Sequence, residues 1–201
     1  MDNGAYEGER MSEAKLLEVT KMLEPTAVVL PDSPGNYLTT KALSMRFAEL
    51  LEKEGMKTEK LVVLHAPRGQ LAIFELAYRQ ATLYADWIGF SRLTMKYGVP
   101  GETFLNRRSW FAKHLQHEGF WDWSKNHHAL GMLGGAVPEL HRLHHVGFKG
   151  CDSSSPVWRG LNGYRYGDPW SDIPFSLRGP DYPDLERAEA NLKEVLEACQ
   201  G

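Results

Sequence analysis

Residues 150–156 read Gly-Cys-Asp-Ser-Ser-Ser-Pro, and Gly160, Asn162 and Gly163 follow them. A short run of apolar and small residues ends in the carboxylate of Asp152, and the proline and glycines beyond it interrupt the strand-like pattern. An α/β barrel presents its reactive groups in this way, at the carboxyl ends of its strands. The stretch therefore predicts a barrel strand that delivers Asp152 to a pocket.

Two further carboxylates stand in comparable positions. Asp2 lies in the segment Met-Asp-Asn-Gly-Ala-Tyr at the start of the chain, and Asp32 follows the run Val-Val-Leu-Pro at residues 28–31. Acids at segment ends in separate parts of the chain predict one site that is assembled from distant residues.

Helical and strand-like segments alternate along the sequence. Leu16, Val19 and Leu23 recur at helical spacing after a possible cap at Ser12, whereas residues 26–30 are short, β-branched and apolar. The expected helices span residues 12–23, 39–54 (capped by Thr39 or Thr40), 71–84, 106–117, 138–146 and 184–199, and the expected strands span residues 26–30, 61–64, 87–90, 129–133 and 148–151.

Short strands separated by helices imply parallel pairing through right-handed crossovers, so we expect one α/β domain over residues 1–201. Residues 164–183, rich in Gly, Pro, Asp and aromatic side chains, read as a long ordered loop before the terminal helix. The residues expected to follow strand ends, and so to share one mouth, are Asp32, His65, Ser91, Gly134 and Asp152. Asp32 in particular is expected at an exposed strand end.

The composition is that of an ordinary soluble globular protein, with 42% hydrophobic and 24% charged residues. No apolar run reaches membrane-spanning length, which argues against a membrane partner. The beginning of the chain lacks a secretory pattern, and Cys151 and Cys199 cannot form a thiolate zinc site by themselves. We expect buried thiols and a cytoplasmic location.

The net charge of −3 argues against a surface that is basic throughout. Residues 57–113 nevertheless carry nine Lys or Arg against four Asp or Glu. Such a segment is either a solvated helix face or a local basic rim able to hold a phosphate backbone.

Several short motifs follow one another over about residues 2–166. Residues 152–163 contain an aspartate, then Pro, then Asn-Gly, and residues 2–7 read Asp-Asn-Gly-Ala-Tyr-Glu. Residues 30–34 read Leu-Pro-Asp-Ser-Pro. Order and spacing resemble the guanine transglycosylase family (queuine tRNA-ribosyltransferase-like), which exchanges guanine for a 7-deazaguanine. Three further segments resemble parts of the family. Residues 44–48 are similar to its next helix, residues 88–91 to its Ile-Gly-Gly-Leu motif, and residues 130–134 to its next-to-last barrel strand.

The resemblance implies a (β/α)8 TIM-barrel-like fold with parallel strands, whose first two strands would lie upstream of Met1. It implies no cofactor and no metal, since the family's C-terminal zinc module has no counterpart in the sequence. The implied site residues are Asp152 as nucleophile, Asp2 as general acid and base, Asp32, Tyr6, His65, Gly89, Phe90, Leu130 and Gly131 for the base, and Arg159, Asn162 and Arg165 for nucleic acid.

The implied chemistry suits these residue types. A carboxylate can attack an oxocarbenium-like sugar carbon and form a covalent glycosyl-enzyme. A second carboxylate can protonate the leaving guanine and deprotonate the incoming base. A third can accept hydrogen bonds from the N1–H and exocyclic amine of a guanine edge.

The sequence departs from the family at one base contact and at two arginine positions, and the loss of the arginines favours DNA over tRNA as substrate. His65 stands where the family has a glutamine that contacts the base, and Trp158 and Leu161 stand where it has arginines. With the zinc module absent as well, the chain is most similar to compact phage and bacterial members that insert 7-deazaguanines such as preQ0 into DNA. A guanine in duplex DNA would have to be flipped out.

Three alternatives remain from the sequence. The first is a tRNA-guanine transglycosylase. The second is a metal-dependent barrel hydrolase, prompted by His127-His128 and by the histidines at positions 141, 144 and 145, although the latter group is expected on a crossover helix. The third is an inactive fragment or subunit, completed by a homodimer or another partner that supplies the missing strands.

Overall fold

The computed structural model describes residues 11–67, 69–91, 106–131, 137–152, 155–165 and 183–200. Within these ranges, five parallel strands form one sheet in the order β1-β2-β3-β4-β5. The strands are β1 (Ala27–Val29), β2 (Glu59–Val63), β3 (Trp87–Ser91), β4 (Asn126–Leu130) and β5 (Gly150–Cys151).

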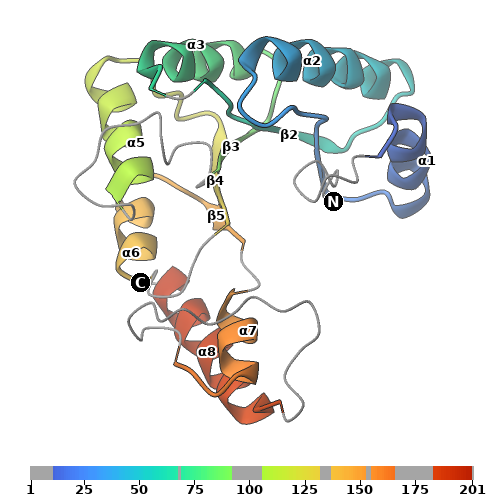
Figure 1. Cartoon of the computed structure of the whole chain (residues 1–201). Coiled ribbons are helices and arrows are strands. Elements are labelled where there is room, and N and C mark those ends of the chain that lie inside the picture. The colour runs from blue at the N-terminus through green and yellow to red at the C-terminus, as the bar shows by residue number, and fades with distance from the viewer. Residues whose placement is uncertain are drawn as a thin grey trace.

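The order of the strands explains the curvature of the sheet. Each strand pairs with the next one along the chain, and the order never reverses as it does in a doubly wound sheet. With crossovers of one hand, the helices fall on one face, and the sheet curls away from them. Figure 1 shows the result, a half-barrel with helices around its outside. The predicted TIM-barrel-like α/β fold with parallel strands is confirmed.

The helices outside the sheet begin and end near the predicted positions. They are α1 (Glu13–Leu23), α2 (Tyr37–Lys53), α3 (Leu71–Ala81), α5 (Arg107–His117) and α6 (Val137–His145). None of the helices in the described ranges is long and apolar enough to cross a membrane.

The cap of α2 differs from the prediction. Ser12 caps α1 as expected, by accepting a hydrogen bond from the amide of Lys15. Helix α2, however, is capped by Asn36, whose Oδ1 accepts from the Thr39 amide at 3.0 Å. Thr40 is not the cap because its hydroxyl bonds both the amide and the carbonyl of Ser33.

Strand β4 lies three residues earlier than predicted, from Asn126 to Leu130 rather than over 129–133. The apolar run after residue 129 suggested the later position. Strand β4 instead includes His127 and His128, because the two side chains point to opposite faces of the sheet and each has a polar partner there, Tyr78 for His127 and Asp152 for His128. The histidines near the end of α6 do lie on a crossover helix, as expected.

The C-terminal part contains a helix that the sequence did not predict, α7 (Ser155–Leu161), and the expected terminal helix, α8 (Leu185–Gln200). The two pack side by side at the lower end of Figure 1. A Cβ on Gly160 would lie 2.2 Å from the Cα of Ala188, so only glycine permits this approach.

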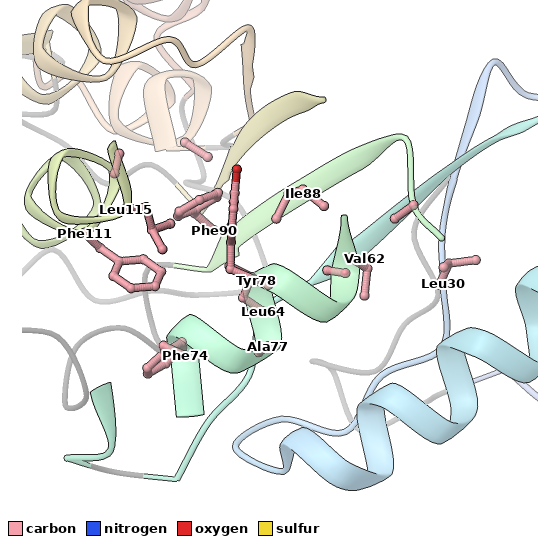
Figure 2. Close-up of a cluster of buried hydrophobic side chains, with 14 of the residues drawn as sticks. Leu30, Val62, Leu64, Phe74, Ala77, Tyr78, Ile88, Phe90, Phe111 and Leu115 are labelled. Atoms are coloured by element: carbon pink, nitrogen blue, oxygen red, sulfur yellow. The ribbon is translucent and has the colours of Figure 1, made fainter. Parts of the chain in front are cut away.

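The core lies between the sheet and its helices. Side chains alternate between the two faces of a strand, and Val62, Leu64, Ile88 and Phe90 point to the helix side, where they are buried. Figure 2 shows these residues against α3 and α5, where Phe74, Ala77, Tyr78, Phe111 and Leu115 complete the cluster.

The alternate residues of the same strands line the concave face. Val63 pairs in register with Gly89, Gly89 with His128, and His128 with Gly150, so one row crosses four strands. The carboxyl ends of the strands lie just beyond this row, where parallel barrels build their sites.

Candidate active site at the carboxyl ends of the strands

The structure brings Asp32 and His65 together. Asp32 follows β1 and His65 follows β2, and the two segments are tied by the hydrogen bond from the Leu30 amide to the Leu61 carbonyl. Oδ2 of Asp32 lies 2.5 Å from Nε2 of His65. Their exposed fractions are only 6% and 2%, so the prediction that Asp32 sits at an exposed strand end is wrong.

A backbone contact indicates which ring nitrogen of His65 carries the proton. The Gly35 amide donates to Nδ1 of His65 at 3.4 Å, from a turn in which Gly35 has φ +75°. Nδ1 is therefore an acceptor, and the ring proton lies on Nε2, which donates to Asp32.

Helix α2 anchors the loop that carries Asp32. Ser44 donates to the carbonyl of Pro31 at 2.8 Å, and Thr40 holds both backbone groups of Ser33. Burial raises the pKa of Tyr84, a hydrogen-bond partner of Ser44, to about 12, so this phenol stays protonated at neutral pH. Asp32 thus sits between two fixed peptide groups.

A second Asp–His pair stands on the opposite side of the half-barrel. Nε2 of His128 lies 3.0 Å from Oδ1 of Asp152. The Asp152 amide donates to the Ala129 carbonyl at 3.2 Å, which extends the β4–β5 ladder by one residue. The Asp152 side chain is 55% exposed, in contrast to the buried carboxylate of Asp32.

The sequence suggested His128 only as a candidate metal ligand and did not place it beside Asp152. Its imidazole lies over β5, where a Cβ on Gly150 would meet Nδ1 at 2.5 Å. The Trp87 ring meets it edge-on at 6.1 Å, and Trp87 donates to Glu59 at 2.6 Å. His128 could have been identified from its position two residues before the end of β4, because the neighbouring strand β5 is followed directly by Asp152.

His127 points to the other face and has a structural role. It is buried, and the Trp121 ring stacks on it at 3.7 Å. The Asp122 amide donates to the hydroxyl of Tyr78, which in turn donates to Nε2 of His127 at 2.9 Å. Burial lowers the pKa of His127 to about 4, so the ring is neutral at pH 7.

Arg108 of α5 was also missed. It is 1% exposed, and its guanidinium donates to the carbonyls of Phe90 at 3.3 Å and Leu130 at 2.8 Å. Its Nε donates to Glu139 of α6 at 2.8 Å. Arg108 therefore fixes the carboxyl ends of β3 and β4 from the helix side.

The predicted base-contacting positions on β3 and β4 lie as follows. Gly89 is on the concave face, where a Cβ would lie 2.8 Å from Cδ1 of Leu130 and 3.0 Å from Leu61. The ring of Phe90 is buried among the helix-side aromatics. Gly131, the residue after β4, has φ +69°, a left-handed conformation that favours glycine.

The predicted nucleic-acid contacts lie on and after α7. Arg159 is buried, and its Nε donates to the carbonyl of Arg165 at 3.1 Å, so it braces the turn that follows the helix. The side chain of Arg165 is mostly exposed. Asn162 lies in the turn between them. Contact of these residues with nucleic acid stays a prediction.

Three of the predicted site residues, Asp2, Tyr6 and Gly134, lie outside the described residues. Cys151 is half-buried, whereas the side chain of Cys199 is not described. Within the part of the chain that the structure describes, no three His, Cys, Asp or Glu side chains gather in a metal-binding arrangement.

Comparison with known proteins yields a match in fold only. No protein-family model matches the chain, and neither does any curated protein. The structure is similar to that of a Schiff-base-forming fructose-1,6-bisphosphate aldolase, with a TM-score of 0.50 and 14% sequence identity. The similarity covers 89% of this chain but 62% of the aldolase, so the chain spans less than two thirds of that protein's length. At this identity the similarity shows the barrel-like fold alone.

Proposed function

We propose that the protein is a base-exchanging transglycosylase that replaces guanine in nucleic acid with a 7-deazaguanine. The observation that supports it best is the pairing of two Asp–His contacts at the carboxyl ends of one half-barrel. One carboxylate, Asp152, is exposed, and the other, Asp32, is buried in a fixed loop. Two carboxylates in such different environments suit two different roles.

Asp152 is the nucleophile in this proposal. Its carboxylate oxygen attacks C1′ of the nucleoside, the C1′–N9 bond breaks, and the electron pair passes to the departing guanine, which takes up a proton. The incoming 7-deazaguanine then attacks C1′ through its own nitrogen and loses its proton, and the carboxylate leaves. Asp2 is the proposed proton carrier. Two displacements at one carbon retain its configuration.

Asp32 and His65 are the proposed recognition pair. Because the Oδ2 atom of Asp32 already accepts from His65, a guanine edge would meet a carboxylate whose orientation is fixed before binding. Such preorganisation lowers the cost of ordering the site around the base.

The proposed substrate is DNA. The proposal depends on Trp158 and Leu161, which stand where the family has arginines, and on the local basic segment at residues 57–113. Binding through phosphate contacts and one extruded base should weaken steeply with salt.

The test is base exchange, followed by mass spectrometry of the nucleosides. Guanine-containing DNA and tRNA are each incubated with the protein and preQ0 or related bases at equal nucleotide concentration. We expect the deazapurine to enter DNA and little to enter tRNA. Preferential labelling of tRNA would reverse the substrate assignment, and no exchange into either would refute the proposed function.

A covalent adduct is the second measurement. Wild-type protein and Asp152→Asn are mixed with DNA and separated on a denaturing gel. The amide is a far poorer nucleophile than the carboxylate, so the adduct should be absent from the variant. An adduct that persists in Asp152→Asn would show that another residue attacks the sugar.

A further inference from the structure

We propose that His128 is a positioning residue for Asp152, and that its hydrogen bond controls how fast the carboxylate leaves the sugar in the second half of the exchange. The inference rests on the proposed function and deepens it. It starts from the 3.0 Å contact between Nε2 of His128 and Oδ1 of Asp152. A carboxylate only accepts hydrogen bonds, so Nε2 carries the proton and donates it.

The surroundings of His128 hold the ring in this orientation. His128 and Gly150 are register partners on β4 and β5, and the imidazole occupies the space that a side chain at position 150 would fill. The edge of Trp87 borders the ring, and Trp87 is itself fixed by its bond to Glu59. These contacts direct Nε2 toward the end of β5, where Asp152 begins the next loop.

The hydrogen bond distinguishes the two oxygens of Asp152. Oδ1 is the acceptor of His128, so Oδ2 is the oxygen that attacks C1′. After the attack, Oδ2 forms the ester bond to C1′ and Oδ1 becomes the ester carbonyl oxygen. When the incoming base displaces the carboxylate, the C1′–Oδ2 bond breaks and its electron pair returns to Asp152.

Negative charge develops on both carboxylate oxygens in that second step. A hydrogen bond to the charged form is stronger than one to the neutral ester. The His128 N–H therefore stabilises the departing carboxylate more than it stabilises the ester. The same bond stabilises the free carboxylate before the first step, so its loss should slow release of the sugar without slowing the attack.

The other Asp–His pair does not fit this role. Asp32 and His65 are both buried, and both ring nitrogens of His65 are engaged, one by Asp32 and one by the Gly35 amide. His128 contacts the exposed carboxylate. It is therefore the histidine placed to act on the nucleophile.

The experiment measures adduct formation and adduct breakdown separately. Full-length protein and DNA are mixed without a second base, and the glycosyl-enzyme is followed on a denaturing gel; excess preQ0 is then added and its disappearance is timed. In His128→Leu we expect breakdown to be roughly tenfold slower, with formation unchanged or faster. His128→Gln, which keeps an N–H donor of similar reach, should recover much of the breakdown rate.

Gly150→Ala is the matched control, because it displaces the imidazole and leaves both members of the pair in the sequence. It should slow breakdown as His128→Leu does. If His128→Leu slows adduct formation and adduct breakdown equally, or leaves breakdown at the wild-type rate, the inference is wrong. Base exchange by the wild-type protein would still support the proposed function in that case.

A spectroscopic measurement tests the contact without turnover. The side-chain ¹⁵N signals of His128 should show a proton on Nε2 in the wild type and should shift in Asp152→Ala. Unchanged signals would refute the contact whether or not the protein exchanges bases. A wild-type protein that forms no adduct would refute both the proposed function and this inference, even if the contact is present.

Discussion

His65 donates from Nε2 to Asp32 across 2.5 Å, and the two residues together close the gap between the ends of β1 and β2. Asp32 is only 6% exposed and His65 only 2%. A substitution at either position should therefore change the internal structure as well as the proposed base recognition, and the two effects have to be measured separately.

We expect Asp32→Ala to lower the unfolding free energy by about 1–3 kcal/mol, because it leaves the buried His65 donor without its acceptor. Guanine affinity should fall as well. Urea unfolding reports the first effect, and calorimetric titration with guanine at a temperature where the variant is folded reports the second. Asp32→Asn keeps the shape and an acceptor oxygen, so it should recover stability better than base affinity. Unchanged guanine affinity in a folded Asp32→Ala would reduce Asp32 to a structural residue.

His127 should make the protein less stable in mild acid. Its pKa is lowered to about 4 in the folded protein, against roughly 6.5 in an unfolded chain. The unfolded state therefore binds more protons between these values, and the stabilising contribution, complete above pH 6.5, is lost as the pH falls toward 4. At pH 5 the loss should be roughly 2 kcal/mol.

The measurement is urea unfolding at pH 7 and pH 5, in wild type and in His127→Gln. The variant cannot take up the proton, so its stability should change less between the two pH values. An equal loss in both proteins would assign the acid sensitivity to other groups.

Arg108 should be among the most sensitive positions in the fold. Arg108→Leu leaves the buried carboxylate of Glu139 without its partner and frees the carbonyls of Phe90 and Leu130. Removal of one member of a buried ion pair costs about 3–5 kcal/mol. The double variant Arg108→Leu/Glu139→Leu should be less destabilised than the single one, and chemical unfolding of the set gives the coupling. Additive losses would show that the two residues act independently.

Gly160 should tolerate no side chain. The Cβ of Gly160→Ala would lie 2.2 Å from a backbone atom of α8, which cannot move aside as a flexible side chain would. We expect α7 and α8 to separate, with a loss of about 1–3 kcal/mol. Limited proteolysis near residues 161–165 and thermal unfolding would detect the change. A variant with wild-type melting temperature and protease resistance would contradict the close approach of the two helices.

The fold was predictable because its signals are local. Alternating short apolar strands and capped helices imply parallel crossovers, and Asp32, His65, Ser91 and Asp152 lie at or just beyond strand ends, as expected. The exact extent of β4 was not predictable from apolar pattern. His127 and His128 are polar, and they belong in the strand only because Tyr78 and Asp152 receive them on opposite faces.

The contacts within the site required the fold. Arg108 and Glu139 are 31 residues apart, and nothing in either helix suggests a buried pair. The exposure of Asp32 was predicted wrongly, because the loop after β1 turns inward where Ser44 and Thr40 bind its backbone. The space at Gly150 for His128 likewise appears only when β4 and β5 lie in register.

Helix α8 contributes no predicted site residue, yet it supports the segment that follows Asp152. Helix α7 starts at Ser155, shortly after Asp152. Helix α8 packs against the other end of α7 at Gly160, and Asn191 of α8 donates a hydrogen bond to the Tyr164 carbonyl at 2.9 Å. If Asp152 is the nucleophile, as proposed, shortening the chain before α8 would therefore lower activity from a distance: substrate could still bind, while the attacking oxygen would no longer be held in position.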